Sequence, residues 1–394
     1  MRLKNITKKA GVFILTAALA AGIAGGCGKE SSSGSSSSSA GESSKKTENL
    51  GTLNVSFPTG NIRVAVNILA LKLGYFDEEG VKVNPVNLSG MNALTAINEG
   101  DGQLDILTAG FVPDLQAIAS GYDLKFIAGT AVEGGALIAK KGNADKFKSD
   151  STKIDLEAVA GAQLGFVRNE SAWVVARQYL LDNGISNDRI KEIEDEKSGS
   201  IKYYEEPINT AQAVQKGEIE VGFLPMEFAL LYADAYDLEI IVPSGELQPD
   251  YVCCREVTSA KKYNENKNVF TAYEKARIRA FEYYKKGESD NDVKKKVVDI
   301  IAEYSGKEKD YVETYLYGGV TKYATDPNTN GIVAYVEAAY NSGLLSSAAV
   351  DFSSYDIKQN IDTSAYKEAL DSLIKENPDN SFYKSLSEQY SSAN

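Results

Sequence analysis

The fold of this chain is decided by the stretch ALTAINEGDGQLDIL at residues 93–107 and by its echo, AQAVQKGEIEVG, at residues 211–222. In each stretch an amphipathic helix ends at a glycine, and an apolar run interrupted by one acid then enters a buried strand. A Pro-containing segment, the tripeptide Tyr-Asp-Leu and a final strand follow both copies. The matched order favours an internal duplication and therefore two similar lobes. The alternative to a duplication is that the two stretches are similar only because any two α/β halves look alike.

Short apolar runs alternate with helical periodicity on both sides of these stretches. In the first half we expect strands at 53–57, 81–86, 104–107 and 124–128, and helices at 62–73, 92–98 and 113–119. In the second half we expect strands at 163–167, 201–204, 219–223 and 238–242, and helices at 171–183, 210–215 and 226–235. This alternation implies βαβ units and a mostly parallel sheet, flanked by helices, in each lobe.

Two connecting segments set the predicted domain organisation. If the chain crosses to the second lobe near residues 135–140 and returns near 243–255, the lobes are joined by a two-strand hinge. The chain then turns helical, and these helices would complete the first lobe. We therefore predict an α/β, two-lobed protein with lobe 1 at residues 51–138, lobe 2 at 139–242, and the completion of lobe 1 at 243–394.

Composition excludes several classes of function. The formal net charge is −13 over 394 residues, which argues against nucleic-acid binding. No histidine occurs, so Ser-His-Asp and Cys-His nucleophilic sites and His-ligated zinc are excluded. No phosphate-binding glycine loop, EF-hand or cysteine cluster is present, and we expect neither a metal nor a cofactor. A carboxylate-based hydrolase is the enzyme hypothesis that stays open.

The N-terminus has the pattern of an export signal. A basic start is followed by an apolar run, residues 11–23, that is too short to span a bilayer comfortably. The segment resembles a bacterial lipoprotein signal with its lipobox, although Ala24 stands where leucine is favoured. We expect residues 1–26 to be a cleaved signal peptide and Cys27 to be the lipidated N-terminus. The alternative is a disordered start with an accidental cysteine.

The residues that follow favour the same interpretation. Residues 27–50 are mostly Ser, Gly, Lys and Glu and have almost nothing to bury, which predicts a flexible tether. Cleavage after residue 26 would remove four basic residues and no acids, leaving a formal charge of −17. We expect a globular body held by one lipid anchor at the outer face of the cell membrane.

Apart from Cys27 the chain holds only two cysteines, the adjacent Cys253 and Cys254. Consecutive Cα atoms lie about 3.8 Å apart, which is shorter than the usual disulfide span. Because side chains alternate along a strand, we interpret the pair as two thiols that face opposite sides. A strained vicinal disulfide is the alternative.

A set of segments covering about residues 52–343 carries a family resemblance. They are LALKLGYFDEEGVKV at 69–83, GMNALTAINEGDGQLDILTAG at 90–110, LGFVRNESAWVVARQYLLDNGI at 164–185, GEIEVGFLPMEF at 217–228 and PDYVCCREV at 249–257. In these segments the chain resembles the nitrate/sulfonate/taurine/thiamine-precursor family of substrate-binding proteins, which serve ABC importers. The resemblance implies a type II periplasmic-binding-protein-like fold whose two lobes close on a ligand without chemistry. A branch that makes the thiamine pyrimidine from its own histidine is excluded, because this chain has none.

Candidate ligand loops follow the carboxyl ends of the predicted strands, where helix N-termini attract anions. The resemblance implies ligand contacts in the loops at 89–92 and 168–173, whereas Pro-Met-Glu at 225–227 departs from the Trp-Glu-Pro that family members often show. The candidate ligand-binding residues are Thr59, Asn61, Gly90, Met91, Asn92, Gly110, Phe111, Arg168, Asn169, Glu170, Ser171, Trp173, Met226 and Glu227.

Several of these side chains have two interpretations. Trp173, the only Trp, would either stack on a ligand or pack against its lobe. Met91 and Met226 would adapt to an irregular apolar ligand, or would be ordinary packing residues. Arg168 would pair with an anionic head group or with a neighbouring acid.

The ligand prediction depends on which side chains reach it. Arg168 with Gly, Asn and Ser loops suits an alkanesulfonate, taurine-like or other small oxyanion, which is the ligand we expect. Trp173 and Met91, with Glu170 and Glu227 as acceptors for ligand amines, suit a thiamine-pyrimidine precursor or a flavin instead. The two glutamates would otherwise only favour their helix N-termini.

The function we expect is therefore that of a monomeric, extracytoplasmic solute-binding lipoprotein. It would capture a small organic ligand and deliver it to the membrane permease of an ABC importer. Its partners would be the ligand, the permease and the lipid bilayer, and not nucleic acid.

Overall fold

The computed structural model describes residues 48–167, 171–198, 200–345 and 350–394. These described residues form one compact unit. The predicted signal peptide, Cys27 and nearly all of the predicted tether lie outside the described residues. Within the described part of the chain, no helix combines the length and the apolar character needed to cross a membrane.

The first sheet region, which we call lobe 1, is built on five strands: β1 (Gly51–Ser56), β2 (Val81–Val86), β3 (Leu107–Gly110), β4 (Leu124–Gly129) and β11 (Cys254–Ser259). Strands β1 and β2 are parallel, and a parallel bridge between Val55 and Ile106 joins β1 to the segment that leads into β3. Strand β11 lies between β3 and β4 and is antiparallel to both. The order is therefore β2-β1-β3-β11-β4, with β11 reversed.

The second sheet, in lobe 2, is formed by β6 (Gly135–Lys140), β7 (Leu164–Val167), β8 (Ile201–Tyr204), β9 (Val221–Pro225) and β10 (Leu238–Pro243). Its order is β8-β7-β9-β6-β10, with β8, β7 and β9 parallel and β6 antiparallel to both of its neighbours. This is the order of lobe 1 repeated. In both sheets the reversed strand is the one that follows the crossing from the other lobe.

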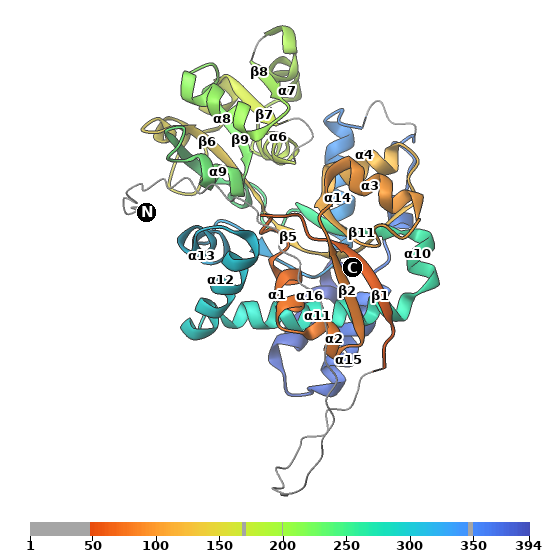
Figure 1. The fold of residues 1–394 in the computed structure, drawn as a ribbon. Helices are drawn as coiled ribbons and strands as arrows, with labels where there is room; N and C mark the ends of the chain where they lie inside the picture. The colour runs from red at the N-terminus through yellow and green to blue at the C-terminus, as the bar shows by residue number, and fades with distance from the viewer. Residues whose placement is uncertain (1–47, 168–170, 199, 346–349) are drawn as a thin grey trace, which may run out of the picture. The chain divides into compact units, whose positions relative to one another are not determined.

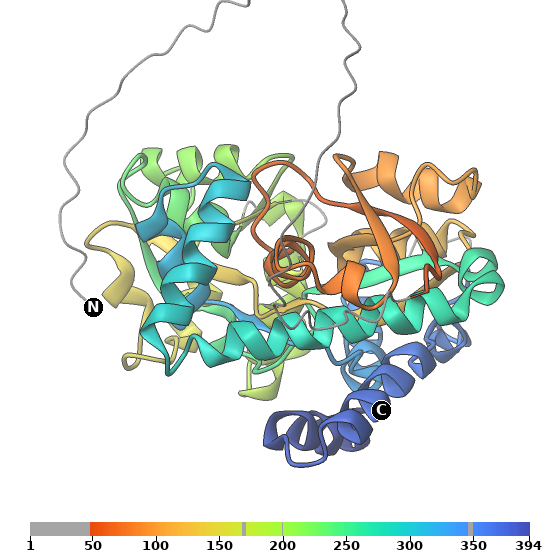
Figure 2. The ribbon, with the colours of Figure 1, turned by 60° about the horizontal axis from the view of Figure 1, so that its bottom comes forward.

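Helices flank both sheets. Those that directly follow a strand of the two sheets are α1 (Ala65–Lys72), α3 (Gly90–Glu99), α4 (Phe111–Ala119), α6 (Ala172–Asp182), α8 (Pro207–Lys216), α9 (Met226–Tyr232) and α10 (Ala260–Glu265), and the short α2 (Tyr75–Glu78) follows α1. The others are α5 (Leu156–Gly161), α7 (Asn187–Glu194), α11 (Lys267–Lys286), α12 (Asn291–Ser305), α13 (Lys309–Tyr317), α14 (Thr329–Asn341), α15 (Ser364–Glu376) and α16 (Ser381–Ala393). The long helix α11 packs against α1, α2 and α15, and Figures 1 and 2 show it between the N-terminal elements and the C-terminal helices.

The predicted α/β fold with mostly parallel sheets is confirmed, each sheet having one reversed strand. The two similar stretches at 93–107 and 211–222 correspond to α3 with β3 and to α8 with β9. Both helices end at a glycine in the left-handed conformation, Gly100 with φ 63° and Gly217 with φ 74°. The strand predicted at 104–107 starts later, at Leu107, because Ile106 makes a single bridge instead of a ladder. Strand β11 begins at the end of the return segment predicted near 243–255 and extends beyond it to Ser259.

Two chain crossings connect the lobes. The first runs between β5 (Ala131–Val132), which pairs with β12 (Lys322–Tyr323), and β6. The return crossing precedes β11 and pairs with the first through an antiparallel bridge from Val132 to Val252. Each crossing contains a non-glycine residue with positive φ, Glu133 at 56° and Asp250 at 57°, and the Asp250 amide donates to the Glu133 carboxylate at 2.6 Å. The residues at which the lobes divide stay a prediction.

A charged network is buried inside lobe 1. Arg277 contacts two carboxylates, Glu274 at 2.6 Å and Glu256 at 3.2 Å, and all three side chains are fully buried. Glu256 also accepts hydrogen bonds from Asn67, Thr108 and Tyr273 at 2.6–3.1 Å, all through Oε1, whereas Arg277 contacts Oε2. Two buried carboxylates on one guanidinium cannot both be compensated, and burial raises the pKa of Glu274 to about 8 despite Arg277.

Candidate functional site

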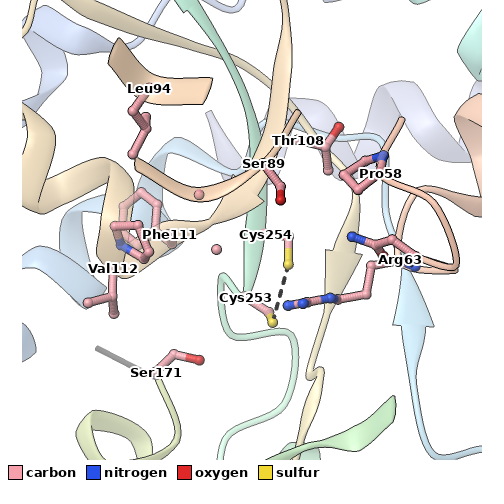
Figure 3. Close-up of a pocket in the computed structure, with 14 residues that line it drawn as sticks. Pro58, Arg63, Ser89, Leu94, Thr108, Phe111, Val112, Ser171, Cys253 and Cys254 are labelled. Atoms are coloured by element: carbon pink, nitrogen blue, oxygen red, sulfur yellow. Dashed lines mark hydrogen bonds between the residues drawn. The ribbon is translucent and has the colours of Figure 1, made fainter. Parts of the chain in front are cut away.

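A cavity of about 260 Å³ lies where the loops after β1, β2 and β3 meet the return crossing (Figure 3). Lobe 1 contributes most of its wall, and Ser171, at the start of α6, comes from lobe 2. The described residues that line the cavity are Pro58, Asn61, Arg63, Ser89, Gly90, Leu94, Thr108, Gly110, Phe111, Val112, Pro113, Ser171, Cys253 and Cys254. The position agrees with the rule that ligands bind outside the carboxyl ends of strands in α/β sheets.

Three helix N-termini converge on this cavity. Ser89 precedes α3, Gly110 precedes α4 and Ser171 precedes α6, and all three residues line the wall. In none of the three does the side chain of the preceding residue cap the helix. In α4, however, the Phe111 amide donates to the Cys253 carbonyl at 2.9 Å and Pro113 has no N–H, so α4 offers fewer donors than α3 and α6. The first backbone N–H groups of a helix lack intrahelical partners and carry a partial positive charge. Together the three helices create a site that favours an anion.

Arg63 adds a full positive charge to the same wall. Its guanidinium forms an ion pair with Glu227 of lobe 2 at 2.9 Å, and the two side chains are 22% and 13% exposed. The backbone carbonyl of Glu227 also accepts a hydrogen bond from the Tyr311 hydroxyl at 2.8 Å. Burial raises the pKa of Tyr311, so this phenol stays a neutral donor at physiological pH. Arg63 thus lines the cavity and also connects lobe 1 to lobe 2 through its ion pair with Glu227.

A neighbouring cavity of about 270 Å³ lies on the outer side of this ion pair. Its lining includes Thr59, Asn61, Glu227, Lys307 and Tyr311. Asn61 belongs to both cavities, and its side-chain oxygen accepts a hydrogen bond from the Arg63 amide at 2.8 Å. The Arg63–Glu227 pair therefore separates the inner cavity from a more open one.

The structure brings part of the predicted site together. Asn61, Gly90, Gly110, Phe111 and Ser171 line the inner cavity, whereas Thr59 and Glu227 line the outer one. Met91 is 53% exposed and Asn92 is also exposed, and neither lines a described cavity. Met226 is fully buried, and its amide donates to Gly134. Arg168, Asn169 and Glu170 lie outside the described residues.

Trp173 lies in the interior of lobe 2. Only 7% of it is exposed, its ring lies 4.7 Å from that of Phe166 at an interplanar angle of 54°, and Phe223 contacts it edge-on. The indole nitrogen donates to Glu194 at 3.0 Å, and Arg177 pairs with the same carboxylate oxygen. These contacts correspond to the packing interpretation of Trp173, and its stacking on a ligand stays a prediction.

Sequence reasoning missed Arg63 and the contribution of the two cysteines. Arg63 sits among the apolar residues that predicted the first helix, and no local pattern distinguishes it. The prediction that Cys253 and Cys254 face opposite sides of a strand is wrong: their sulfurs lie 3.5 Å apart, and both line the cavity. Strand β11 starts at Cys254, so Cys253 precedes the region where side chains alternate.

The described lining offers several hydrogen-bond donors to a ligand. It supplies hydroxyls, one amide, one guanidinium, two thiols and backbone N–H groups, and none of the described lining residues is an aspartate or glutamate. The nearby Asp114 of α4 is fully buried, and neither of its oxygens accepts a hydrogen bond from a described residue. Burial raises the pKa of Asp114 well above its usual range, which favours a neutral carboxyl.

Comparison with known proteins places the fold. No protein-family model and no curated protein matches the chain. Among solved structures, the ligand-binding component of an ABC-type import system from Staphylococcus aureus, with zinc bound, superposes with a TM-score of 0.61 at 16% identity, over 81% of this chain and 98% of that one. The nitrate-binding protein NrtA from Synechocystis PCC 6803 gives a TM-score of 0.60 at 15% identity, over 82% and 89%.

The alkanesulfonate-binding protein SsuA from Xanthomonas axonopodis pv. citri, bound to MOPS, gives a TM-score of 0.53 at 16% identity, over 75% of this chain and 94% of that one. At such identities the likeness shows the fold alone. The described chain has the periplasmic-binding-protein fold.

Proposed function

We propose that this chain is an extracytoplasmic solute-binding protein that captures a small organic anion, an alkanesulfonate or taurine-like molecule, and delivers it to an ABC importer. The observation that carries the proposal is the convergence of three uncapped helix N-termini and Arg63 on one cavity. The fold, which is shared with sulfonate-, nitrate- and metal-bound components of such importers, supports the transport role.

The lining favours a small oxyanion over a heteroaromatic ring. Phe111 is the only aromatic residue of the described wall, and Trp173 packs within lobe 2. The volume of about 260 Å³ is below the size of pockets that hold drug-sized ligands, roughly 300–1,000 Å³. A flavin would exceed the space, whereas a taurine-sized anion would fit.

Calorimetric titration of the full chain tests the ligand class. Taurine and short alkanesulfonates should bind, and an aminopyrimidine or riboflavin should not. Arg63→Gln should weaken sulfonate binding about tenfold or more, because a hydrogen bond to a charged group contributes about 1.5–3 kcal/mol. Arg189→Gln is the matched control, since Arg189 pairs with the exposed Glu192 far from the cavity. Tight binding of the ring compounds, or equal affinity in the two variants, would contradict the proposal.

The cellular location is tested separately. With Cys27 as the lipidated residue, Cys27→Ser should leave the precursor unprocessed or release the protein from the membrane fraction. A variant with the parent's fractionation and N-terminus would refute the lipid anchor without affecting the ligand proposal.

A receptor also returns its ligand unchanged. Incubation of the bound anion with the protein, followed by mass spectrometry, should recover the intact compound. Conversion would identify the chain as a hydrolase instead.

A further inference from the structure

The two adjacent cysteines form a dithiol that opens on the cavity. The sulfurs of Cys253 and Cys254 lie 3.5 Å apart, and Figure 3 shows the pair with Arg63 extending toward it. Gly134 of the opposite crossing closes one side of Cys253, because a Cβ added there would lie 2.8 Å from the sulfur. The backbone itself therefore keeps the two thiols together.

The charges around the pair favour its reactive form. A thiolate is the nucleophile and the metal ligand, and neighbouring cations stabilise it. Arg63 lines the same cavity, and the fully buried Arg255 donates to the Cys254 carbonyl at 2.8 Å.

The separation of the sulfurs limits what can join them. An ion bonded to both sulfurs at about 2.3 Å, the usual zinc–thiolate bond length, would have an angle of about 100° between its two bonds, because the sulfurs lie 3.5 Å apart. A linear two-coordinate cation would require sulfurs about 4.6 Å apart with the same bonds. A disulfide would require them to approach by about 1.5 Å, across a Cα spacing shorter than the usual range.

The number of protein ligands further limits which ion or centre the two sulfurs could hold. Structural zinc takes four protein ligands, and the described residues contain no group of three or more Cys, Asp or Glu side chains able to hold a metal ion. A pyramidal, three-coordinate centre needs only two sulfurs and keeps its third position for oxygen. Its bond angles lie below the tetrahedral value, as the geometry of this pair demands.

We propose that Cys253 and Cys254 form a chelating site for one trivalent thiophilic centre of the arsenite class. With As(OH)₃, two As–O bonds break and two As–S bonds form, and the two thiol protons leave with two hydroxyls as water. The third As–O bond remains, and no atom changes oxidation state. The bound centre lies on the wall of the anion cavity, so it also blocks anion binding; this second consequence rests on the proposed function.

Sodium arsenite added to the reduced full chain tests the site. One arsenite per chain should protect both thiols from a thiol reagent, and dithiothreitol should reverse the protection. Cys253→Ser and Cys254→Ser should each weaken arsenite binding about 100-fold or more, since the second sulfur otherwise reacts intramolecularly. Cys27→Ser is the matched control and should bind like the parent. Circular dichroism verifies that each variant is folded, and Cys253→Ala and Cys254→Ala repeat the measurement if a serine variant is not.

The possible results separate the alternatives. Unchanged arsenite binding in either single variant, or thiols that stay reactive in excess arsenite, overturns the proposal. Formation of a disulfide with oxidised glutathione in a chain that does not bind arsenite overturns it in favour of a redox pair. Arsenite stoichiometry is measured without any sulfonate, so failure of the proposed transport function leaves this test decisive.

Discussion

Lobe 1 and lobe 2 carry sheets of the same strand order, with the reversed strand in the same place. At equivalent strand ends they differ. The end of β3 brings Thr108, Gly110 and Phe111 to the cavity, whereas the end of β9 buries Met226 and directs Glu227 toward Arg63. A shared topology therefore supplies equivalent positions, and the side chains decide which lobe contacts the ligand and which contacts the other lobe.

The interiors differ in the same way. Lobe 1 contains the buried network of Arg277, Glu274 and Glu256, and Thr108 connects that network to the cavity wall. Lobe 2 contains the aromatic cluster of Phe166, Trp173 and Phe223. A charged interior is costly unless every group is paired, whereas an aromatic interior depends on volume. Substitutions should therefore affect the two lobes through different mechanisms.

The first of two large effects is expected from Arg277→Leu in lobe 1. It leaves two carboxyls buried without their cation, and we expect a loss of about 3–5 kcal/mol in the free energy of unfolding, measured in urea. Arg177→Gln is the matched change in lobe 2, where the Arg177–Glu194 pair is partly exposed, and it should cost less. Equal losses in the two variants would remove the distinction between the interiors.

Trp173→Ala should destabilise lobe 2 by about 3–5 kcal/mol, the usual cost of removing a large buried side chain. Trp173→Phe should retain most of that stability and bind ligand like the parent, as judged by urea unfolding and calorimetry. A tenfold loss of affinity in a stable Trp173→Phe variant would instead place the indole against the ligand, as one sequence interpretation predicts.

The pH dependence of stability should come from lobe 1. The pKa of Glu274 is about 8 in the folded protein and about 4.5 in the unfolded chain, so the folded state binds the proton more tightly. Its contribution is fully present below pH 4.5 and is lost as the pH rises through 8. Urea unfolding between pH 5 and 9 should show this decline, and Glu274→Gln should flatten it. An identical decline in the variant would assign the effect elsewhere.

The smallest effect concerns the contact between the lobes. Glu227→Gln should destabilise the arrangement in which Arg63 and residue 227 hold the lobes together by about 1 kcal/mol, as expected for the loss of a partly exposed ion pair. Small-angle scattering of the ligand-free chain should show a larger radius of gyration than for the parent, because the lobes separate about their hinge. Glu192→Gln, which alters the exposed pair with Arg189, is the control. No difference between the two variants would show that Arg63 serves the ligand alone.

Much of the site could be anticipated because it is local in sequence. A helix that follows a strand directly exposes its first N–H groups at the strand's carboxyl end, and Gly90, Gly110 and Ser171, predicted on that ground, line one cavity. Arg63 and Cys253 gave no such indication. Their importance arises from segments distant in sequence, Glu227 for the first and the crossing at Gly134 for the second.

Local pattern by itself determined the helices, the strands, their glycine ends and the repeat of one α/β half, because these depend on neighbours a few residues apart. Only the tertiary structure decided that β6 and β11 insert in reverse into the opposite sheets, that Trp173 packs inward, and that two adjacent thiols share one cavity. Each of these outcomes depends on which distant surfaces are buried together, and burial between distant segments leaves no periodicity in the chain.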